Sequence, residues 1–210
     1  MTTLRDMQIR AVTFFALFVC GAAMADVTER FAKVRDDAEA IEGLGSFLDR
    51  YIGDCGILPS PDCISRAKTF RQGATGKKFY MIVTEESASM LSMGAFDPST
   101  QKFTINMTPI FPASSYALTH GIPSRTDAHG NPVMTYLPIS GVAPEETDAA
   151  TIGRWVSMRN VRVQVVFTPQ GVWEMPKKGG GKIRGVKAQF VAVRLTNAKN
   201  GAELGLWFAR

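Results

Sequence analysis

Histidine and cysteine are scarce in this sequence: its 210 residues include only 2 His and 3 Cys. Few side chains are therefore available for a metal centre or for the histidine base of a serine hydrolase. The chain also has no Gly-x-Ser-x-Gly turn, which commonly presents a catalytic serine, and no internal repeat. After residue 25, no apolar run approaches the roughly 20 residues of a transmembrane helix. These absences argue against a serine hydrolase, a repeat protein and a mature chain with a transmembrane helix.

Residues 1–25 have the order of a secretory signal peptide. Basic residues precede the apolar run 11–19, and the small-residue sequence Ala23-Met24-Ala25 ends just before Asp26. The apolar run is too short to span a bilayer comfortably. Lipid attachment at Cys20 is disfavoured because bulky residues precede it, where a small residue is preferred. We therefore expect simple cleavage between Ala25 and Asp26.

The remaining residues, 26–210, suit one secreted domain. Their number is sufficient to bury a substantial core. The hydrophobic content of 45% is typical of globular proteins, and the formal net charge of the full chain is only +5. We expect a helical segment over 26–73, a β-rich part over 77–210, and a location in the periplasm or outside the cell.

Cys55 and Cys63 are the two cysteines that remain after signal cleavage. Export delivers them to an oxidising compartment, where a disulfide across the short intervening loop is the simplest interpretation. Free thiols and a metal site are the alternatives, but two cysteines without a nearby histidine supply only half of a typical ligand set. A bond requires that the two Cα atoms lie within about 7 Å of each other.

Two stretches near the N-terminus have the pattern of helices. Within 27–54, apolar residues recur at three- and four-residue steps between charged ones, and Gly43 and Gly45 indicate a kink or two separate helices. The sequence Ser60-Pro61-Asp62 is typical of a helix start, and Gly73 of a helix end. We therefore also expect a helix over 61–72.

From Lys77 onward the apolar residues alternate with a period of two, which indicates strands. Strands over 79–83, 90–96 and 103–107 predict a three-stranded meander. Residues 109–131 are rich in Pro, Ser, Gly and Asn, so we expect a long irregular connection there. A further strand over 133–137 and a short helix after Pro144 complete this part.

The final third has the clearest strand pattern. Strands are expected from Val161 to Phe167 and from 186 to 196, and Asn200-Gly201 predicts a hairpin into a last strand. The apolar phase changes between Phe190 and Val191, which indicates either a bulge or burial on both faces. The residues expected to be buried in these strands are Val161, Val163, Val165, Phe190, Leu204, Leu206 and Phe208.

The combined pattern predicts an α+β fold in which N-terminal helices pack on a mainly antiparallel sheet. About seven strands would form a sandwich or an open barrel. The helices would cover one face or one end of this sheet.

His120, Asp127 and His129 lie in one loop and are the candidates for a site with chemistry. Imidazole nitrogens and a carboxylate oxygen are common ligands of transition metals. Their spacing matches no metal motif, and Gly-rich loops often carry polar residues for turn formation alone. We therefore keep them as candidate ligand-binding residues and predict neither a metal nor another cofactor.

Lys177, Lys178 and Lys182 flank a Gly-rich turn, a composition that can bind anions through backbone N–H groups. The turn does not match a phosphate-binding loop, because Pro176 occupies the position of the first glycine and Ile183 follows the last lysine. The three lysines remain candidates for binding an anionic ligand.

Charge is distributed unevenly along the chain. Every charged residue between Glu174 and Glu203 is basic, as is every charged residue from Arg66 to Lys78, whereas 26–54 is mostly acidic. If the basic segments share a face, an anionic envelope component is a suitable partner, and another envelope protein is the alternative. Nucleic acid is disfavoured by export and by the lack of aromatic residues interleaved with the basic stretch.

These observations favour a non-enzymatic, exported envelope protein that acts as a binding or structural module. The alternative is a metal-binding protein, or a metal-dependent hydrolase, that uses His120, Asp127 and His129. A hydrolase of envelope material without a metal is a third class, which would require a histidine beside a carboxylate and a nucleophile.

The signal peptide gives a direct prediction. We expect the exported protein to begin at Asp26, because the small residues Ala23 and Ala25 form a cleavage site. N-terminal sequencing of protein recovered from the periplasm or the medium, together with its intact mass, checks this. Recovery of a chain that still begins at Met1 would contradict the prediction.

Overall fold

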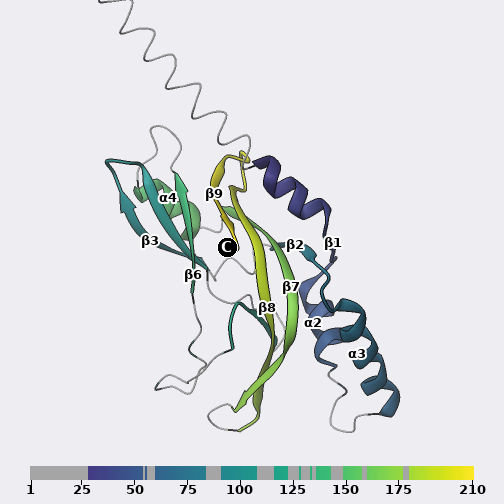
Figure 1. The fold of residues 1–210 in the computed structure, drawn as a ribbon. Helices are drawn as coiled ribbons and strands as arrows, with labels where there is room; N and C mark the ends of the chain where they lie inside the picture. Colours follow the sequence, from purple (N-terminus) through teal and green to yellow (C-terminus); the bar gives the residue numbers. More distant parts are fainter. Residues whose placement is uncertain are drawn as a thin grey trace, which may run out of the picture.

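The computed structural model describes residues 28–53, 55, 60–83, 91–107, 116–122, 128, 133, 136–142, 149–157, 160–176 and 180–210. The predicted signal peptide lies outside these residues. Among them, nine strands form two sheets that curve around a shared core (Figure 1). This is an α+β fold with mainly antiparallel sheets, so the predicted fold class is confirmed.

The two sheets differ in size. The large sheet has six strands in the order β1-β2-β7-β8-β5, with β9 also paired to β8, and the small sheet has the order β3-β4-β6. The large sheet contains β1 Glu39–Ala40, β2 Phe79–Val83, β5 Tyr116–Thr119, β7 Val161–Pro176, β8 Lys182–Asn197 and β9 Glu203–Phe208. The small sheet contains β3 Leu91–Asp97, β4 Lys102–Met107 and β6 Leu137–Val142. The helices are 28–36, α2 Leu44–Ile52, α3 Pro61–Ala74 and α4 Ala149–Ser157.

The antiparallel pair β7 and β8 is the longest element of the fold. Each strand has 16 residues, more than the two strands predicted there, because the pairing continues down to Pro176 and Lys182. The strand β2 attaches to the edge of β7, whereas β9 and β5 attach to different lengths of the free edge of β8. The strands β2, β5 and β9 therefore bond directly to this pair, whereas β1 bonds to β2.

A bulge at Val191 lets β8 serve two cores. Phe167 faces Phe190, and Val166 faces Ala192, so Val191 has no partner of its own on β7. Phe190 belongs to the main core, whereas Ala192 and Val166 belong to a second cluster on the opposite face. Both alternatives raised by the sequence therefore apply, since the strand is bulged and is buried on both faces.

The helical residues 28–36 cover that second face. Phe31 is buried there against Val166 and Ala192, and Leu206 and Phe208 of β9 pack around it. The expected burial of Leu206 and Phe208 is wrong, because both are only partly buried; they pack on the second face, against Phe31. A bulge at Leu204 causes this change, since Gly205 pairs with Leu195 and Glu203 with Thr196.

The strand pairing corrects three further expectations. The strand β2 does not form a meander with β3 but joins β1 and β7, where Phe79 and Met81 are buried in the main core. The buried four-residue strand β5 runs parallel to β8 within the connection expected to be irregular. The strand expected over 133–137 is β6, which begins at Leu137. In each case, burial against a partner distant in sequence decided the pairing.

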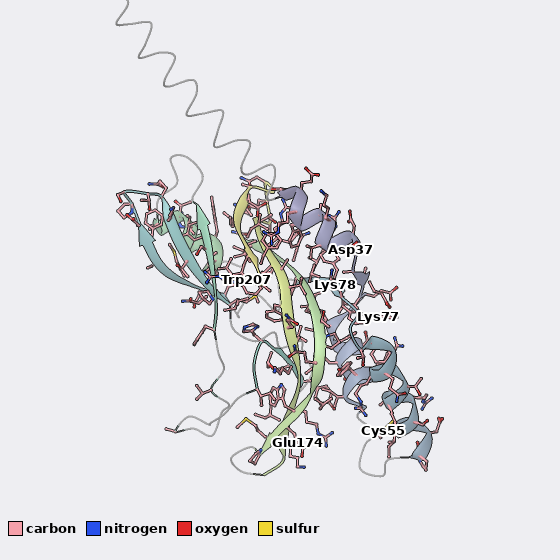
Figure 2. All side chains as sticks on the ribbon, in the orientation of Figure 1. Asp37, Cys55, Lys77, Lys78, Glu174 and Trp207 are labelled. Carbon is pink, nitrogen blue, oxygen red and sulfur yellow. A yellow bond between two sulfur atoms is a disulfide. The ribbon has the colours of Figure 1, made fainter. Side chains whose placement is uncertain are left out.

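Oppositely charged segments meet beside β1. The Nζ atom of Lys77 lies 3.6 Å from a carboxylate oxygen of Glu39, and that of Lys78 lies 3.8 Å from Asp37. Figure 2 shows Asp37, Lys77 and Lys78 on this side of the molecule. Exposed pairs of this kind add little stability. They do bring the acidic segment of the sequence against one of the basic ones.

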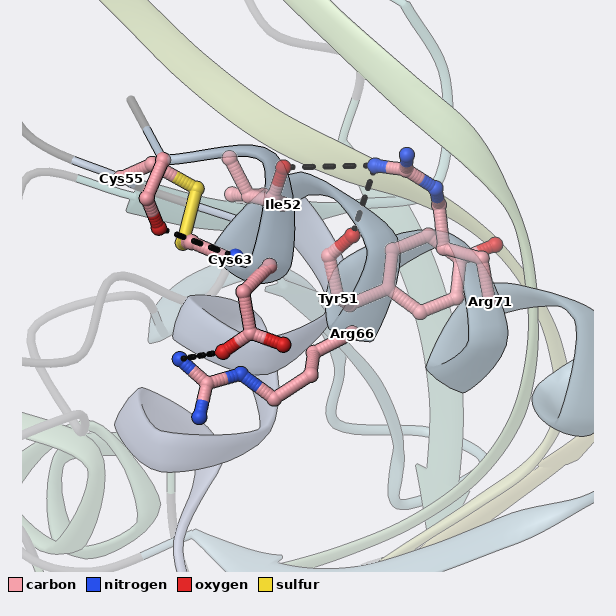
Figure 3. The surroundings of a disulfide bond; sticks show 8 residues. Tyr51, Ile52, Cys55, Cys63, Arg66 and Arg71 are labelled. Carbon is pink, nitrogen blue, oxygen red and sulfur yellow. Dashed lines mark hydrogen bonds and ion pairs between the residues drawn. A yellow bond between two sulfur atoms is a disulfide. The ribbon is translucent and has the colours of Figure 1, made fainter. Parts of the chain in front are cut away.

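A disulfide joins Cys55 to Cys63, as predicted from the sequence. Their Cα atoms are 5.9 Å apart. The bond ties the residues after α2 to the start of α3, where the Ser60 hydroxyl accepts a hydrogen bond from the backbone N–H of Cys63. Arg71 of α3 donates hydrogen bonds to the carbonyl oxygens of Tyr51 and Ile52 at the end of α2 (Figure 3). The two helices are thus joined covalently and by capping.

The two faces of the large sheet give a prediction about stability. Phe167 is fully buried and packs its ring against Phe47 and Phe79. We expect Phe167→Ala to lower the free energy of unfolding by about 3–5 kcal/mol because it leaves a cavity in the main core. Phe208→Ala is the matched control and should cost clearly less, since that ring is only partly buried. Urea denaturation of both variants measures the difference, and equal losses would contradict this description of the core.

Candidate functional site

The small sheet meets the large sheet where β6 passes β9. Gly141 of β6 lies so close to β9 that a Cβ atom on it would overlap the carbonyl oxygen of Leu204. A Cβ atom on Gly205 would lie 3.1 Å from the carbonyl oxygen of Ser140. No backbone ladder is formed between these two strands, although all of their residues are among those described. The sheets therefore touch at a seam of glycines, and this contact depends on the missing side chains.

A cleft of about 540 Å³ opens beside this seam, and we call it the β9 cleft. Phe96, Phe103 and Gly141 occupy one row across the small sheet, because Phe96 pairs with Phe103 and Phe103 pairs with Gly141. Both rings pack against the main core, and the start of β9 forms the facing wall. The cleft is lined by Ala95, Phe96, Asp97, Lys102, Phe103, Thr104, Ser140, Gly141, Glu203, Leu204, Gly205 and Leu206.

Glu203 is the most buried carboxylate of this lining, with a side chain only 15% exposed. Its Oε2 atom accepts a hydrogen bond of 2.8 Å from Nε of Arg194. Its Oε1 atom is buried and has no partner among the described residues. Burial raises the pKa of this carboxyl, and the hydrogen bond and charge of Arg194 oppose that rise. Glu203 is therefore a desolvated acid with unused hydrogen-bonding capacity.

Asp97 and Lys102 lie at the end of the same cleft, opposite each other on β3 and β4. The Asp97 carboxylate accepts hydrogen bonds from the Ser99 hydroxyl at 2.6 Å and the Thr100 hydroxyl at 2.8 Å. These bonds, with that from the Ser99 backbone, lower the pKa of Asp97 to about 2. Asp97 is thus ionised at any ordinary pH and supplies a fixed negative charge at the cleft.

His120 lies outside the β9 cleft lining, on the main-core side of the large sheet. Its ring stacks on Phe190 at a centroid distance of 5.6 Å and meets Trp207 edge to face at 6.3 Å. Its Nδ1 atom is buried and has no partner in the described part of the chain. The other two residues of the candidate metal site, Asp127 and His129, lie outside the described residues. Within the described ranges, no three His, Cys, Asp or Glu residues form a group that would hold a metal ion.

Lys182 forms an ion pair with Glu174 across the β7 and β8 hairpin, with a distance of 2.5 Å between Nζ and Oε1. Arg184 lies 3.7 Å from the same carboxylate. The other two lysines of the candidate anion-binding turn, Lys177 and Lys178, lie outside the described residues. At this hairpin, part of the basic stretch is therefore neutralised by an acid of the same sheet.

A second cavity, of about 580 Å³, lies between α2 and α3 beside the disulfide. At the edge of this cavity, the Arg50 guanidinium stacks over the Phe70 ring, 4.1 Å from the ring centre. Arg66 pairs with Asp62 one turn earlier in α3. Residues 56–59, which join the two helices, lie outside the described residues.

The sequence pattern did not predict the β9 cleft, because the residues that line it come from four separate strands. One signal was present: Glu203 is the acid that ends the long basic stretch after Glu174. An acid placed in such a stretch, next to a strand, is a candidate for a specific contact. No sequence pattern indicated that Asp97 and Glu203 would line the same cleft.

The fold and the cleft define a class: an α+β protein with two sheets and one cleft of ligand size between them. Comparison with known proteins adds the family. The chain belongs to DUF6066, a family of unknown function, whose match covers residues 7–210. No curated protein and no solved structure matches the chain. In the described part of the chain, no helix combines the length and the apolar character needed to span a bilayer.

The glycine seam gives a prediction about the cleft. Gly141→Ala should lower the free energy of unfolding by about 1–3 kcal/mol, because the added methyl group meets the β9 backbone and the Phe103 ring. Gly171→Ala is the matched control, since nothing lies within 4 Å of the position that its Cβ atom would occupy. Thermal or urea unfolding of both variants tests this. A Gly141→Ala protein as stable as the control would show that the sheets do not depend on this contact.

Proposed function

We propose that this protein is an exported, non-enzymatic binding module of the cell envelope, and that its ligand occupies the β9 cleft. The single observation that carries the proposal is the composition of this cleft. It is concave, it is walled by Phe96, Phe103, Leu204 and Leu206, and it includes a few charged groups at defined places. Ligand sites in proteins typically combine a largely apolar wall with a small number of oriented polar groups.

The volume of the cleft supports the same proposal. About 540 Å³ falls within the range of roughly 300–1,000 Å³ that is typical of small-molecule sites. The cleft also lies between two sheets that contact each other without a ladder, so its walls belong to separate layers of the fold.

Export is supported by the sequence of residues 1–25 and by the disulfide. The order of basic, apolar and small residues is that of a signal peptide. A disulfide between Cys55 and Cys63 is more common in oxidising compartments than in the cytosol. Together they favour the periplasm or the extracellular space.

The test is binding of a neutral apolar probe, the fluorescent dye N-phenyl-1-naphthylamine, to the mature protein. We expect saturable binding with one dye per chain. Phe96→Ala should weaken it about tenfold, because loss of one aromatic wall removes roughly 1.5 kcal/mol or more of apolar contact.

Phe208→Ala is the control for this test, since its ring is also partly buried but is not among the residues that line the cleft. Its affinity for the dye should match that of the unmodified protein. If the dye does not bind, or if both variants lose affinity equally, the β9 cleft is not the binding site.

A further inference from the structure

Two acidic residues from distant segments line the β9 cleft of a chain that is basic as a whole. Asp97 is the last residue of β3 and Glu203 is the first residue of β9, whereas the chain has a formal net charge of +5. Lys102 also lines the cleft and lies opposite Asp97 in the strand register, so the lining holds two acids and one base. The formal charge of the lining is therefore negative.

Arg194 matches the charge of Glu203 only in part. Its Nε atom bonds to Oε2, whereas Oε1 is buried and receives no hydrogen bond from any described residue. A buried carboxylate oxygen without a donor is unfavourable, because it has lost its water without gaining a partner. Because Oε1 has almost no accessible surface, a ligand in the cleft can bond to it only if the Glu203 side chain turns toward the cleft, and a donor with positive charge would gain most from that contact.

Apolar surface adjoins this acid. Leu204 and Leu206 follow Glu203 on β9, and the Phe96 and Phe103 rings line the same cleft. A ligand that enters the cleft would therefore meet both kinds of surface, an apolar wall and the carboxylate beside it.

Resting on the proposed function, we propose that the ligand is an amphiphilic amine, with its protonated amino group beside Glu203 and its apolar body along Phe96 and Phe103. Asp97 adds a second, fixed negative charge at the end of the cleft, since the pKa of about 2 keeps it ionised. A primary amine is protonated at neutral pH, so its charge complements both carboxylates. A fatty acid with a chain as long as that of the amine would place its carboxylate against Glu203, and repulsion between the two negative charges disfavours it.

The experiment compares octylamine, 1-octanol and octanoate as competitors of N-phenyl-1-naphthylamine at pH 7. Their chains are the same length, so a difference in affinity reports the head group. We expect octylamine to bind about tenfold more tightly than 1-octanol, because a hydrogen bond to a charged group commonly contributes that much. Octanoate should bind more weakly than either.

Three variants locate the preference. Glu203→Gln should bind octylamine and 1-octanol with similar affinity, because the charge is gone while the shape is kept. Asp97→Asn, at a more exposed position, should reduce the preference only partly. Glu174→Gln is the control, since this carboxylate also pairs with a basic residue but lies at the far hairpin, and it should leave the preference unchanged.

The outcomes separate the two proposals. Equal binding of amine and alcohol by the unmodified protein, tighter binding of octanoate, or an unchanged preference in Glu203→Gln would overturn the amine proposal and leave the apolar cleft in place. If Glu203→Gln does not fold, an unchanged preference in Asp97→Asn would overturn it instead. If none of the three compounds displaces the dye and the dye itself does not bind, the proposed function fails.

Discussion

The pairing of β7 with β8 is the constraint on which the other elements depend. Each strand has 16 residues, and around Val166 and Ala192 both faces of the sheet are buried. A strand with a strict period of two presents one set of side chains to each face. The bulge at Val191 changes that phase, so Phe190 before it and Val193 after it both face the main core, while Ala192 faces the cluster around Phe31. Without the bulge, the helical residues 28–36 would pack on a different set of side chains.

The strand edges explain where the cleft lies. The exposed edge of β1 is only two residues long, and β3 is irregular between Met93 and Phe96, so each is a poor template for pairing with another chain. The edges of β6 and β9 instead lie against each other, with glycines at the contact and no ladder. Two twisted sheets that touch at one point diverge on either side of it. The space left by that divergence is the β9 cleft.

Local signals in the sequence predicted much of the fold. The serine and proline at the start of α3, the disulfide, the turn at Asn200-Gly201 and the phase change at Val191 are each encoded by a few neighbouring residues, and each was confirmed. The sheet partner of β2 was not predictable in this way, because the same alternation suits a meander or a long-range pair. Only the burial of Phe79 and Met81 against β7 distinguishes the two.

The candidate site was harder to predict than the fold for the same reason. His120 attracted attention because it is rare, yet its ring lies against Phe190 and Trp207, away from the residues that line the cleft. Asp97 and Glu203 are common residues at strand ends, and their meeting depends on the Leu204 bulge and on the seam at Gly141, neither of which leaves a mark in the local sequence.

A cleft whose walls belong to two sheets couples its occupancy to the arrangement of those sheets. Phe96 and Phe103 are held by the small sheet, and Glu203 and Leu204 by the large one, so a bound ligand would contact both at once. A ligand that binds only the folded arrangement stabilises it in proportion to the logarithm of its concentration over its dissociation constant. The Glu203 oxygen that lacks a donor belongs to β9. The next residue, Leu204, supplies the carbonyl oxygen that makes the crowded contact with Gly141 of β6. Ligand affinity and the stability of the seam should therefore vary together rather than independently.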